Sequence, residues 1–196
     1  SLWQAMRAQE GVYIERMVQL ASASVKGEIT AQMGSRILGL IRMAGRWESW
    51  GRPDQRQWES DAGVYMVHYP GYEAIEWVDP SFHVRWIVPL VGNEAVRDLY
   101  LGFDEQQRRA LEVSRDRRVV IATRSFDLAP DAKGFIVYAP IFQSEGFSGF
   151  VGGIFRVQQL FDFILSKHHV TPGYAIAVFD GAEEIYSRDA GGRQDR

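Results

Sequence analysis

The chain has 196 residues, of which 46% are hydrophobic and 24% charged, with a net charge of -3 and no cysteine. This balance is typical of a folded globular domain, and the small negative charge argues against nucleic acid as a partner. The lack of cysteine excludes a disulfide framework, thiol catalysis and cysteine-ligated zinc. The sequence contains neither an apolar run of the roughly 18 residues that a membrane span needs nor a signal peptide.

A single long helix is predicted for residues 2 to about 47, which contain no proline and carry apolar side chains at helical spacing. Two stripes run along it, one of Tyr13, Met17, Leu20 and Ser24 and the other of Ile14, Val18, Ala21 and Val25. We expect one stripe to pack on the rest of the chain and the other to meet a second copy in a parallel homodimer. A break or kink is the alternative, because four glycines lie in the segment: Gly27, Gly34, Gly39 and Gly45.

The chain opens directly in this helix-forming sequence, so we expect it to be a domain cut from a longer protein. After Gly51-Arg52-Pro53 a second helix is predicted from one apolar face, formed by Trp58, Ala62, Tyr65, Met66 and Tyr69. Residues 74–78 and 84–89 then indicate a strand, a turn and a strand. We expect Ile75 and Trp77 on one face of this hairpin, and Val84, Trp86 and Val88 on another.

Asp104 and Gln107 have the spacing of a capping box, which predicts a helix to about Arg115, followed by a strand at 119–123. Residues 134–142 and 149–157 are apolar runs rich in β-branched and aromatic residues, and indicate adjacent strands of a buried sheet. The pair Gly152-Gly153 leaves room against the backbone, either for a ligand or for a closely packed helix. A helix at 158–167 and a hairpin at 174–179 and 184–187 complete the chain.

The predicted fold class is therefore α+β, with a long N-terminal helix and an antiparallel sheet of five strands that carries helices on one face and one edge. The last hairpin has no sheet of its own to join, and a lone hairpin is marginal in water. We therefore expect it to be the start of a second, smaller subdomain.

Residues 104–188 resemble the CHASE domain, the extracellular sensor module of plant cytokinin receptors and of many bacterial histidine kinases and diguanylate cyclases. The resemblance rests on the spacing of several pieces: Arg109-Ala110-Leu111-Glu112, residues 119–123 with Phe126-Asp127-Leu128, and residues 134–140, 149–157 and 175–180. It implies that both subdomains are PAS-like. Residues 1–50 would be a signalling and dimerisation helix, 51–157 a membrane-distal ligand-binding subdomain, and 158–196 a linker helix with a partial membrane-proximal subdomain.

The resemblance also implies a periplasmic or extracellular domain of a cell-membrane receptor, flanked by transmembrane helices and binding an unknown small molecule. A cytoplasmic kinase or cyclic-dinucleotide enzyme would follow in the full protein, whereas this fragment would have no catalysis and no cofactor. By position, Asp98 is similar to the family's ligand-binding aspartate, Ile121 to a leucine and Tyr138 to a threonine. The bulk of tyrosine argues against an adenine-derived ligand in the same pose.

Strand parity extends this set to an apolar pocket with a few polar groups, and Arg124 is added as a possible partner for a ligand carboxylate. The predicted ligand-binding residues are Trp86, Val88, Asp98, Ile121, Thr123, Arg124, Ile136, Tyr138, Gly153 and Phe155. The alternatives are that Asp98 is a solvated or capping carboxylate, that Arg124 is simply exposed, and that Tyr138 and Trp86 are core.

Two other function classes remain. A periplasmic hydrolase is disfavoured, because the chain lacks a nucleophile elbow and nucleotide-binding motifs, and because the adjacent His168 and His169 are poorly placed to share a metal. A protein-binding module without a small-molecule site is the second alternative. A cavity beside Tyr138 and Gly153 would favour a small molecule, and a packed interior with an exposed apolar patch would favour a protein partner.

Overall fold

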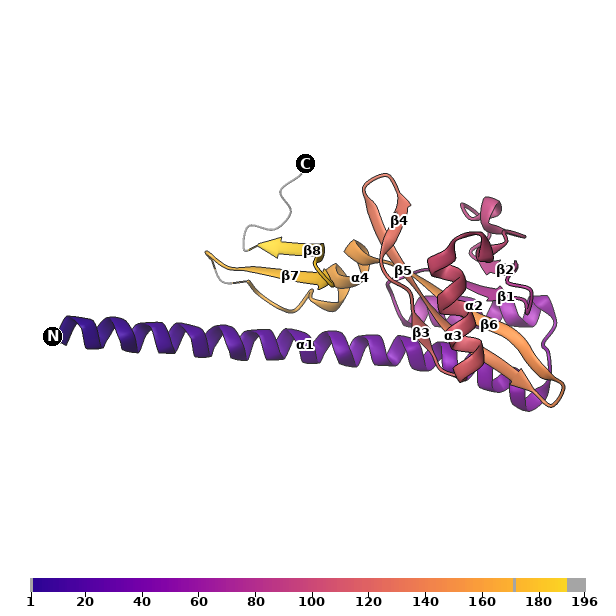
Figure 1. The fold of residues 1–196 in the computed structure, drawn as a ribbon, viewed down its shortest axis with the longest axis horizontal. Coiled ribbons are helices and arrows are strands. Elements are labelled where there is room, and N and C mark those ends of the chain that lie inside the picture. The colour runs from indigo at the N-terminus through magenta and orange to yellow at the C-terminus, as the bar shows by residue number, and fades with distance from the viewer. Residues whose placement is uncertain (1, 171, 190–196) are drawn as a thin grey trace.

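The computed structural model describes residues 2–170 and 172–189, and its dominant feature is a rod-like helix, α1 (Leu2–Trp50), that extends far beyond the rest of the molecule (Figure 1). At 1.5 Å per residue this helix is about 73 Å long. The prediction of one continuous helix is confirmed, and the glycines do not interrupt it. Its C-terminal half is part of the core, whereas residues 11–24 are exposed.

The remaining elements follow the predicted order closely. They are α2 (Gln55–His68), β1 (Tyr72–Val78), β2 (Val84–Val88), the short 3-10 helices η1 (Glu94–Val96) and η2 (Leu101–Phe103), α3 (Glu105–Arg117), β3 (Ile121–Ala122), β4 (Phe126–Ala129), β5 (Ala132–Gln143), β6 (Gly146–Arg156), α4 (Val157–Ile164), β7 (Ala175–Asp180) and β8 (Glu183–Asp189). The N-cap predicted at Asp104 is confirmed, because its side chain accepts a hydrogen bond from the Gln107 amide. Asp54, which was not predicted as a cap, caps α2 in the same way by accepting from the Gln57 amide.

The main sheet is antiparallel, with the strand order β2-β1-β6-β5-β3 and with β4 paired to β5. It has six strands rather than the predicted five. The additional strand is β4, which folds back so that Phe126 lies opposite Gly134. A four-residue strand that pairs with its neighbour through a tight turn carries too few residues for its alternation to be recognised.

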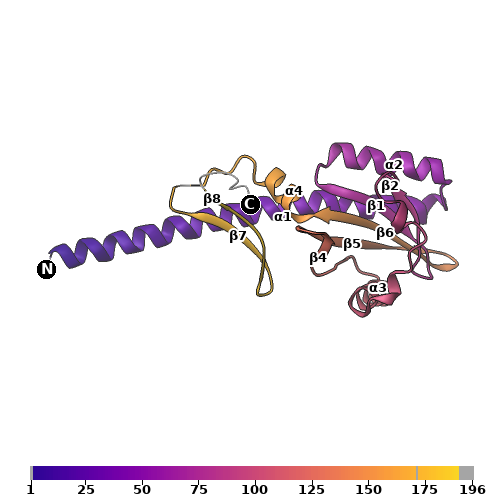
Figure 2. The same cartoon turned by 90° about the horizontal axis from the view of Figure 1, so that it is seen from above.

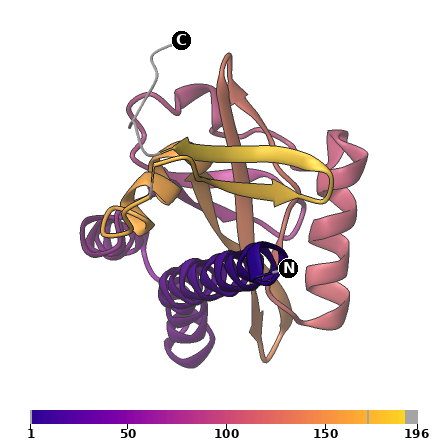
Figure 3. The ribbon, with the colours of Figure 1, turned by 90° about the vertical axis from the view of Figure 1, so that its left-hand side faces the viewer.

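Helices cover both faces of this sheet, and Figure 3, which looks along α1, shows the strands between α1 and α3. On the α1 face, residues of α1, α2 and α4 pack against the strands, as Figure 2 also shows. On the α3 face, Leu111 packs with Ile136 and Tyr138. The prediction of helices on one face and one edge is therefore wrong, because α3 lies across the second face.

The register of the β1–β2 hairpin corrects a second prediction. Ile75 lies opposite Val88 and Trp77 opposite Trp86, so these four residues share the α1 face. Val84 packs on the α3 face, because the register shifts between Trp77 and Val78. Directly paired residues of an antiparallel ladder point to the same side, and the bulge displaces only the end of the hairpin.

The hairpin of β7 and β8 forms a separate two-stranded sheet beside the middle of α1 (Figure 1). Tyr186 packs on Phe161 of α4, with ring centroids 5.4 Å apart. At the turn of the hairpin, Asp180 accepts hydrogen bonds from the amide and hydroxyl of Ser125. These contacts hold in place a hairpin that would be only marginally stable on its own.

Candidate ligand-binding site

One row of paired residues crosses the α3 face of the sheet and contains a buried carboxyl group. The row runs through Ile87, Glu76, Gly152, Tyr138 and Ile121 on five neighbouring strands. Because Gly152 has no side chain, Glu76 and Tyr138 approach one another across it, and the tyrosine hydroxyl donates to Oε1 of Glu76 at 3.4 Å. A Cβ atom at Gly152 would lie 2.9 Å from Glu76 Cγ and 3.0 Å from Tyr138 Cε1.

The third member of this polar cluster comes from α3. Nε2 of Gln107 donates to the Tyr138 hydroxyl at 2.8 Å. The capping box predicted from Asp104 and Gln107 therefore forms only in part: Asp104 accepts from the Gln107 amide, while the Gln107 side chain turns to the sheet. We call Glu76, Tyr138 and Gln107 the buried polar cluster.

The buried polar cluster is shielded from water, and this changes its acid–base behaviour. Burial raises the pKa of Glu76 to about 7, although the hydrogen bond from Tyr138 opposes the rise. Burial, and next the negative charge of Glu76, raise the pKa of Tyr138 well above its usual value. The cluster can therefore gain or lose a proton on Glu76 near neutral pH.

The next row across the sheet lies on the α1 face and contains Gly153. Gly153 pairs with Ile75 and Val137, and a Cβ atom there would lie 2.8 Å from both Leu40 Cδ1 and Tyr72 Cε1. The close-packing alternative for this glycine is therefore the correct one: α1 occupies the space. Phe155 lies on the same face, stacked on Tyr72 at 4.6 Å between ring centroids.

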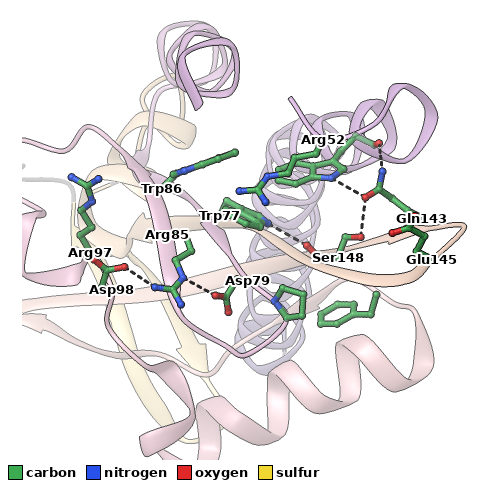
Figure 4. A pocket seen from close by; sticks show the side chains of 13 residues that line it. Arg52, Trp77, Asp79, Arg85, Trp86, Arg97, Asp98, Gln143, Glu145 and Ser148 are labelled. Atoms are coloured by element: carbon green, nitrogen blue, oxygen red, sulfur yellow. Dashed lines mark hydrogen bonds and ion pairs between the residues drawn. The ribbon is translucent and has the colours of Figure 1, made fainter. Parts of the chain in front are cut away.

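An open groove of about 690 Å³ lies at the end of the sheet where α1, the β1–β2 hairpin and the β5–β6 hairpin meet (Figure 4). Its wall is an aromatic cluster of Trp47, Trp77 and Trp86, whose ring centroids are 4.6 to 5.7 Å apart. Two indole groups are held in place, because Trp77 Nε1 donates to the Ser148 carbonyl and Trp47 Nε1 to Gln143 Oε1, both at 3.3 Å. We call this cavity the tryptophan groove.

Charged residues form the rest of the tryptophan groove. Arg85 donates from Nε to Asp79 Oδ2 at 2.6 Å and from a terminal nitrogen to Asp98 Oδ1 at 2.9 Å, as Figure 4 shows. Asp98 is exposed and has a left-handed backbone with φ of 63°. Arg52, Arg97 and Glu145 also line the groove.

The ten predicted ligand-binding residues do not line a single pocket. Trp86 and Asp98 lie in the tryptophan groove, Ile136 and Tyr138 on the α3 face with the half-buried Ile121 in the same row, and Val88, Gly153 and Phe155 on the α1 face. Thr123 accepts a hydrogen bond from the Ile136 amide. Arg124 is exposed, with Nε 4.0 Å from Asp180 of β7.

The predicted cavity beside Tyr138 and Gly153 is corrected by the same geometry. Tyr138 is fully buried under α3, and Gly153 is closed by α1, so side chains fill the space on both sides of the sheet. Strand parity predicted Gly153 and Tyr138 on one face, but Tyr138 lies opposite Gly152, so Tyr138 and Gly153 lie on opposite faces of the sheet.

Sequence reasoning missed Glu76 and Gln107, and in the groove Trp47, Arg52 and Trp77. One signal was available: Glu76 is a carboxylate inside the apolar strand sequence Ala74 to Val78. A charged residue that is fully buried needs a partner, so its position alone marks an unusual site.

A family model described as "CHASE domain" matches residues 40–187. No curated protein sequence matches the chain. None of the helices in the described residues combines the length and apolar character needed to cross a membrane.

Similar solved structures are ligand-binding domains of receptors. An extracellular ligand binding receptor from Desulfohalobium retbaense has a TM-score of 0.69 at 17% identity; the match covers 88% of this chain but only 31% of the receptor. The ligand-binding domain of the Pseudomonas aeruginosa amino acid chemoreceptor PctC, in complex with GABA, has a TM-score of 0.62 at 15% identity, covering 87% of this chain and 74% of that domain. The domain of the Pseudomonas fluorescens chemoreceptor CtaA with L-alanine has a TM-score of 0.59 at 18% identity, covering 87% and 70%. At these identities the likeness establishes the α+β fold of such domains.

Proposed function

This chain belongs to the CHASE domain family, and from that premise we propose that it is the extracytoplasmic ligand-sensing domain of a membrane-bound signalling receptor. The full-length receptor would be a histidine kinase or a diguanylate cyclase or phosphodiesterase, with membrane spans flanking this domain. Residues 51–157 would form its membrane-distal ligand-binding subdomain. Residues 158–196, of which 190–196 lie outside the described residues, would be the linker helix and part of a membrane-proximal one.

The ligand of this sensor is a small molecule that binds in the tryptophan groove. The groove is concave, open to solvent and lined by aromatic and charged side chains, a combination typical of small-molecule sites. PctC and CtaA bind GABA and L-alanine. An amino acid of this size, with one carboxylate and one ammonium group, suits a groove that carries both arginine and acidic side chains.

One observation supports a relay from this groove better than any other: Trp47 is at once a wall of the groove and a residue of α1. Trp47 is almost fully buried and contacts Trp77 and Trp86. A ligand that displaces the tryptophans would therefore shift the C-terminal end of a rigid helix. Because α1 is continuous, that shift reaches its exposed N-terminal half.

The exposed half of α1 carries the pattern expected of a dimer helix. The stripe predicted from Tyr13 to Ser24 continues along the described helix at alternating spacings of four and three residues: Tyr13, Met17, Leu20, Ser24, Gly27, Ala31, Gly34, Leu38, Ile41 and Gly45. These residues face away from the sheet, and nothing lies within 4 Å of a Cβ built at Gly27 or Gly34. Val25, by contrast, packs against the protein body.

A parallel homodimer through this stripe explains why large apolar side chains remain in water and why small residues occupy its middle. The test is disulfide crosslinking of single-cysteine variants Tyr13→Cys, Met17→Cys and Leu20→Cys in the full-length membrane protein. We expect all three to crosslink, and Ser22→Cys, which is exposed on the opposite side of α1, to remain monomeric. No crosslinks on the stripe, or equal crosslinking of Ser22→Cys, would refute the paired helix.

Ligand sensing itself is tested by a thermal-shift panel of the twenty proteinogenic amino acids and GABA on this domain. A ligand at about 100 times its dissociation constant adds about 2.7 kcal/mol to the free energy of unfolding. We expect at least one compound to raise the melting temperature, and Trp77→Ala to abolish the rise. A panel without any shift contradicts an amino acid ligand, and a shift that survives in Trp77→Ala contradicts the tryptophan groove as its site.

A further inference from the structure

The guanidinium group of Arg52 lies over the rings of the tryptophan wall. Its Cζ atom lies 4.6 Å from the ring centroid of Trp77, 5.1 Å from that of Trp86 and 5.9 Å from that of Trp47. Figure 4 shows Arg52 beside Trp77 at the groove. The attraction of a cation to the face of an aromatic ring satisfies none of the acceptor needs of the guanidinium N–H groups, which stay available as hydrogen-bond donors.

The local sequence explains why Arg52 is placed there. Gly51 ends α1 with a left-handed backbone (φ of 88°), and its amide donates to the Trp47 carbonyl at 2.9 Å. This turn reverses the chain so that the next residue lies over the end of α1. Pro53 restricts the backbone of Arg52 to extended conformations. The turn at Gly51-Arg52-Pro53 and the contact with the tryptophan rings therefore both place the arginine.

Hydrogen-bond acceptors for Arg52 are missing within the part of the chain that the structure describes. No hydrogen bond or ion pair joins Arg52 to another described residue, although Asp79, Asp98 and Glu145 line the same groove. Asp79 and Asp98 both bind Arg85 instead. Arg52 is thus a pre-positioned cation with unused donors.

A second donor lies on the other side of Arg52. A neighbouring groove of about 450 Å³ between α1 and α2 is lined by Trp47, Arg52 and Trp58. Trp58 Nε1 is buried and has no hydrogen-bond partner in the described residues, while its ring lies 5.6 Å from that of Trp86. Buried donors in proteins almost always have an acceptor, so the unpaired Trp58 Nε1 is unusual. Together with Arg52 it leaves this end of the tryptophan wall with more donors than acceptors.

We propose that Arg52 is the carboxylate receptor of the tryptophan groove and that the ligand is an organic carboxylate whose body lies on Trp77 and Trp86. This inference rests on the proposed ligand-sensing function and names the chemical class of the ligand. A guanidinium fork matches the two oxygens of a carboxylate, and an arginine already placed over the rings loses less entropy on binding. The tryptophan rings offer the apolar surface that the rest of such a molecule needs.

The experiment compares benzoate with benzamide, which have the same shape and differ in charge. Each compound is titrated into the 15N-labelled domain, and the indole N–H signals of Trp47, Trp77 and Trp86 are followed by NMR. We expect benzoate to bind about ten- to a hundredfold more tightly than benzamide, as a charge-assisted bond implies. In Arg52→Gln this preference should disappear, and higher salt should weaken it in the wild type.

Arg56→Gln is the matched control, because Arg56 is also an exposed arginine, close to Arg52 in the chain, but does not line the tryptophan groove or lie over its rings in the described contacts. It should retain the preference for benzoate. Equal binding of benzamide, a preference that survives in Arg52→Gln, or an equal loss in Arg56→Gln would overturn the role of Arg52.

The outcomes also separate this inference from the proposed function. If benzoate leaves the indole signals unchanged while an amino acid of the panel moves them, ligand sensing in the groove stands and the carboxylate receptor is wrong. If no compound of either set moves these signals, the groove itself is not the ligand site, and both proposals fall.

Discussion

The neighbouring glycines Gly152 and Gly153 lie on opposite faces of one sheet, and different groups pack against each face. On the α3 face, Gly152 makes room for a carboxyl, a phenol and an amide that are buried together. On the α1 face, Gly153 makes room for Leu40 of the long helix. The absence of a Cβ atom therefore makes room for a polar cluster on one face and for a closely packed helix on the other.

The tryptophan groove and the buried polar cluster also differ in the exposure of their charged groups. In the tryptophan groove the charged groups reach solvent, and Arg85 is neutralised by two aspartates. In the buried polar cluster, Glu76 is only 1% exposed, and among the described residues one donor, the Tyr138 hydroxyl at 3.4 Å, reaches its carboxyl group. Ionisation of a buried carboxyl is costly, so we expect the α3 face to respond to pH and the α1 face to depend on apolar packing.

The largest effect is expected where α1 enters the core. Leu40→Ala removes a side chain that is 0% exposed and packs beside Gly153, and it should lower the free energy of unfolding by about 2 to 5 kcal/mol. Val18, on the same helix but outside the stripe proposed for the dimer, is 46% exposed and is the matched control. Val18→Ala should change the free energy by less than about 0.5 kcal/mol in urea unfolding. Similar losses in both variants would mean that α1 is not anchored on this face.

The next largest effect concerns the ionisation of Glu76 and its influence on stability. Its pKa in the folded protein, about 7, lies above the ordinary value of 4.5, so the folded state holds the proton more tightly than the unfolded state. The contribution of this group to stability is therefore greatest below pH 4.5 and falls as pH rises through 7. The total loss is on the order of 3 kcal/mol.

Glu76→Gln should remove this part of the pH dependence. Relative to wild type, the variant should gain stability between pH 5 and pH 8, measured by urea unfolding across that range. Glu73 is on the same strand but half-buried and paired with Arg156, so Glu73→Gln should keep the wild-type dependence. A wild-type protein whose stability does not fall over this interval, or an unchanged slope in Glu76→Gln, would contradict the assignment.

These comparisons show which parts of the structure the sequence could predict. The long helix, α2 and the β5–β6 hairpin follow from local periodicity, which a single sequence displays directly. The helix on the α3 face was predicted as a helix, but the predicted arrangement of helices on one face and one edge was wrong, because the packing of α3 depends on which side of the sheet Leu111 meets. Strand β4 was missed because its four residues carry too little pattern.

The site was harder to predict, since it depends on register rather than on composition. A shift of one residue separates Gly152 from Gly153, and it moves a predicted contact from one face of the sheet to the other. The tryptophan groove is assembled from segments around residues 47, 52, 77, 86 and 143–148. No spacing within the sequence relates these segments, because only the strand order brings them together.

The smallest expected effect tests whether Tyr138 contacts the ionised form of Glu76. Tyr138→Phe removes the acceptor of Gln107 and the donor to Glu76, and should cost about 1 to 2 kcal/mol. Because the hydroxyl lowers the pKa of Glu76, the loss should be larger at pH 8 than at pH 5. Tyr72→Phe on the α1 face makes the same chemical change, but its hydroxyl donates to the backbone carbonyl of Arg36 at 2.6 Å, so its loss should not vary with pH. If urea unfolding gives the same pH response for both variants, the hydrogen bond from Tyr138 does not stabilise the ionised form of Glu76. The electrostatic difference between the two faces would then come from burial alone.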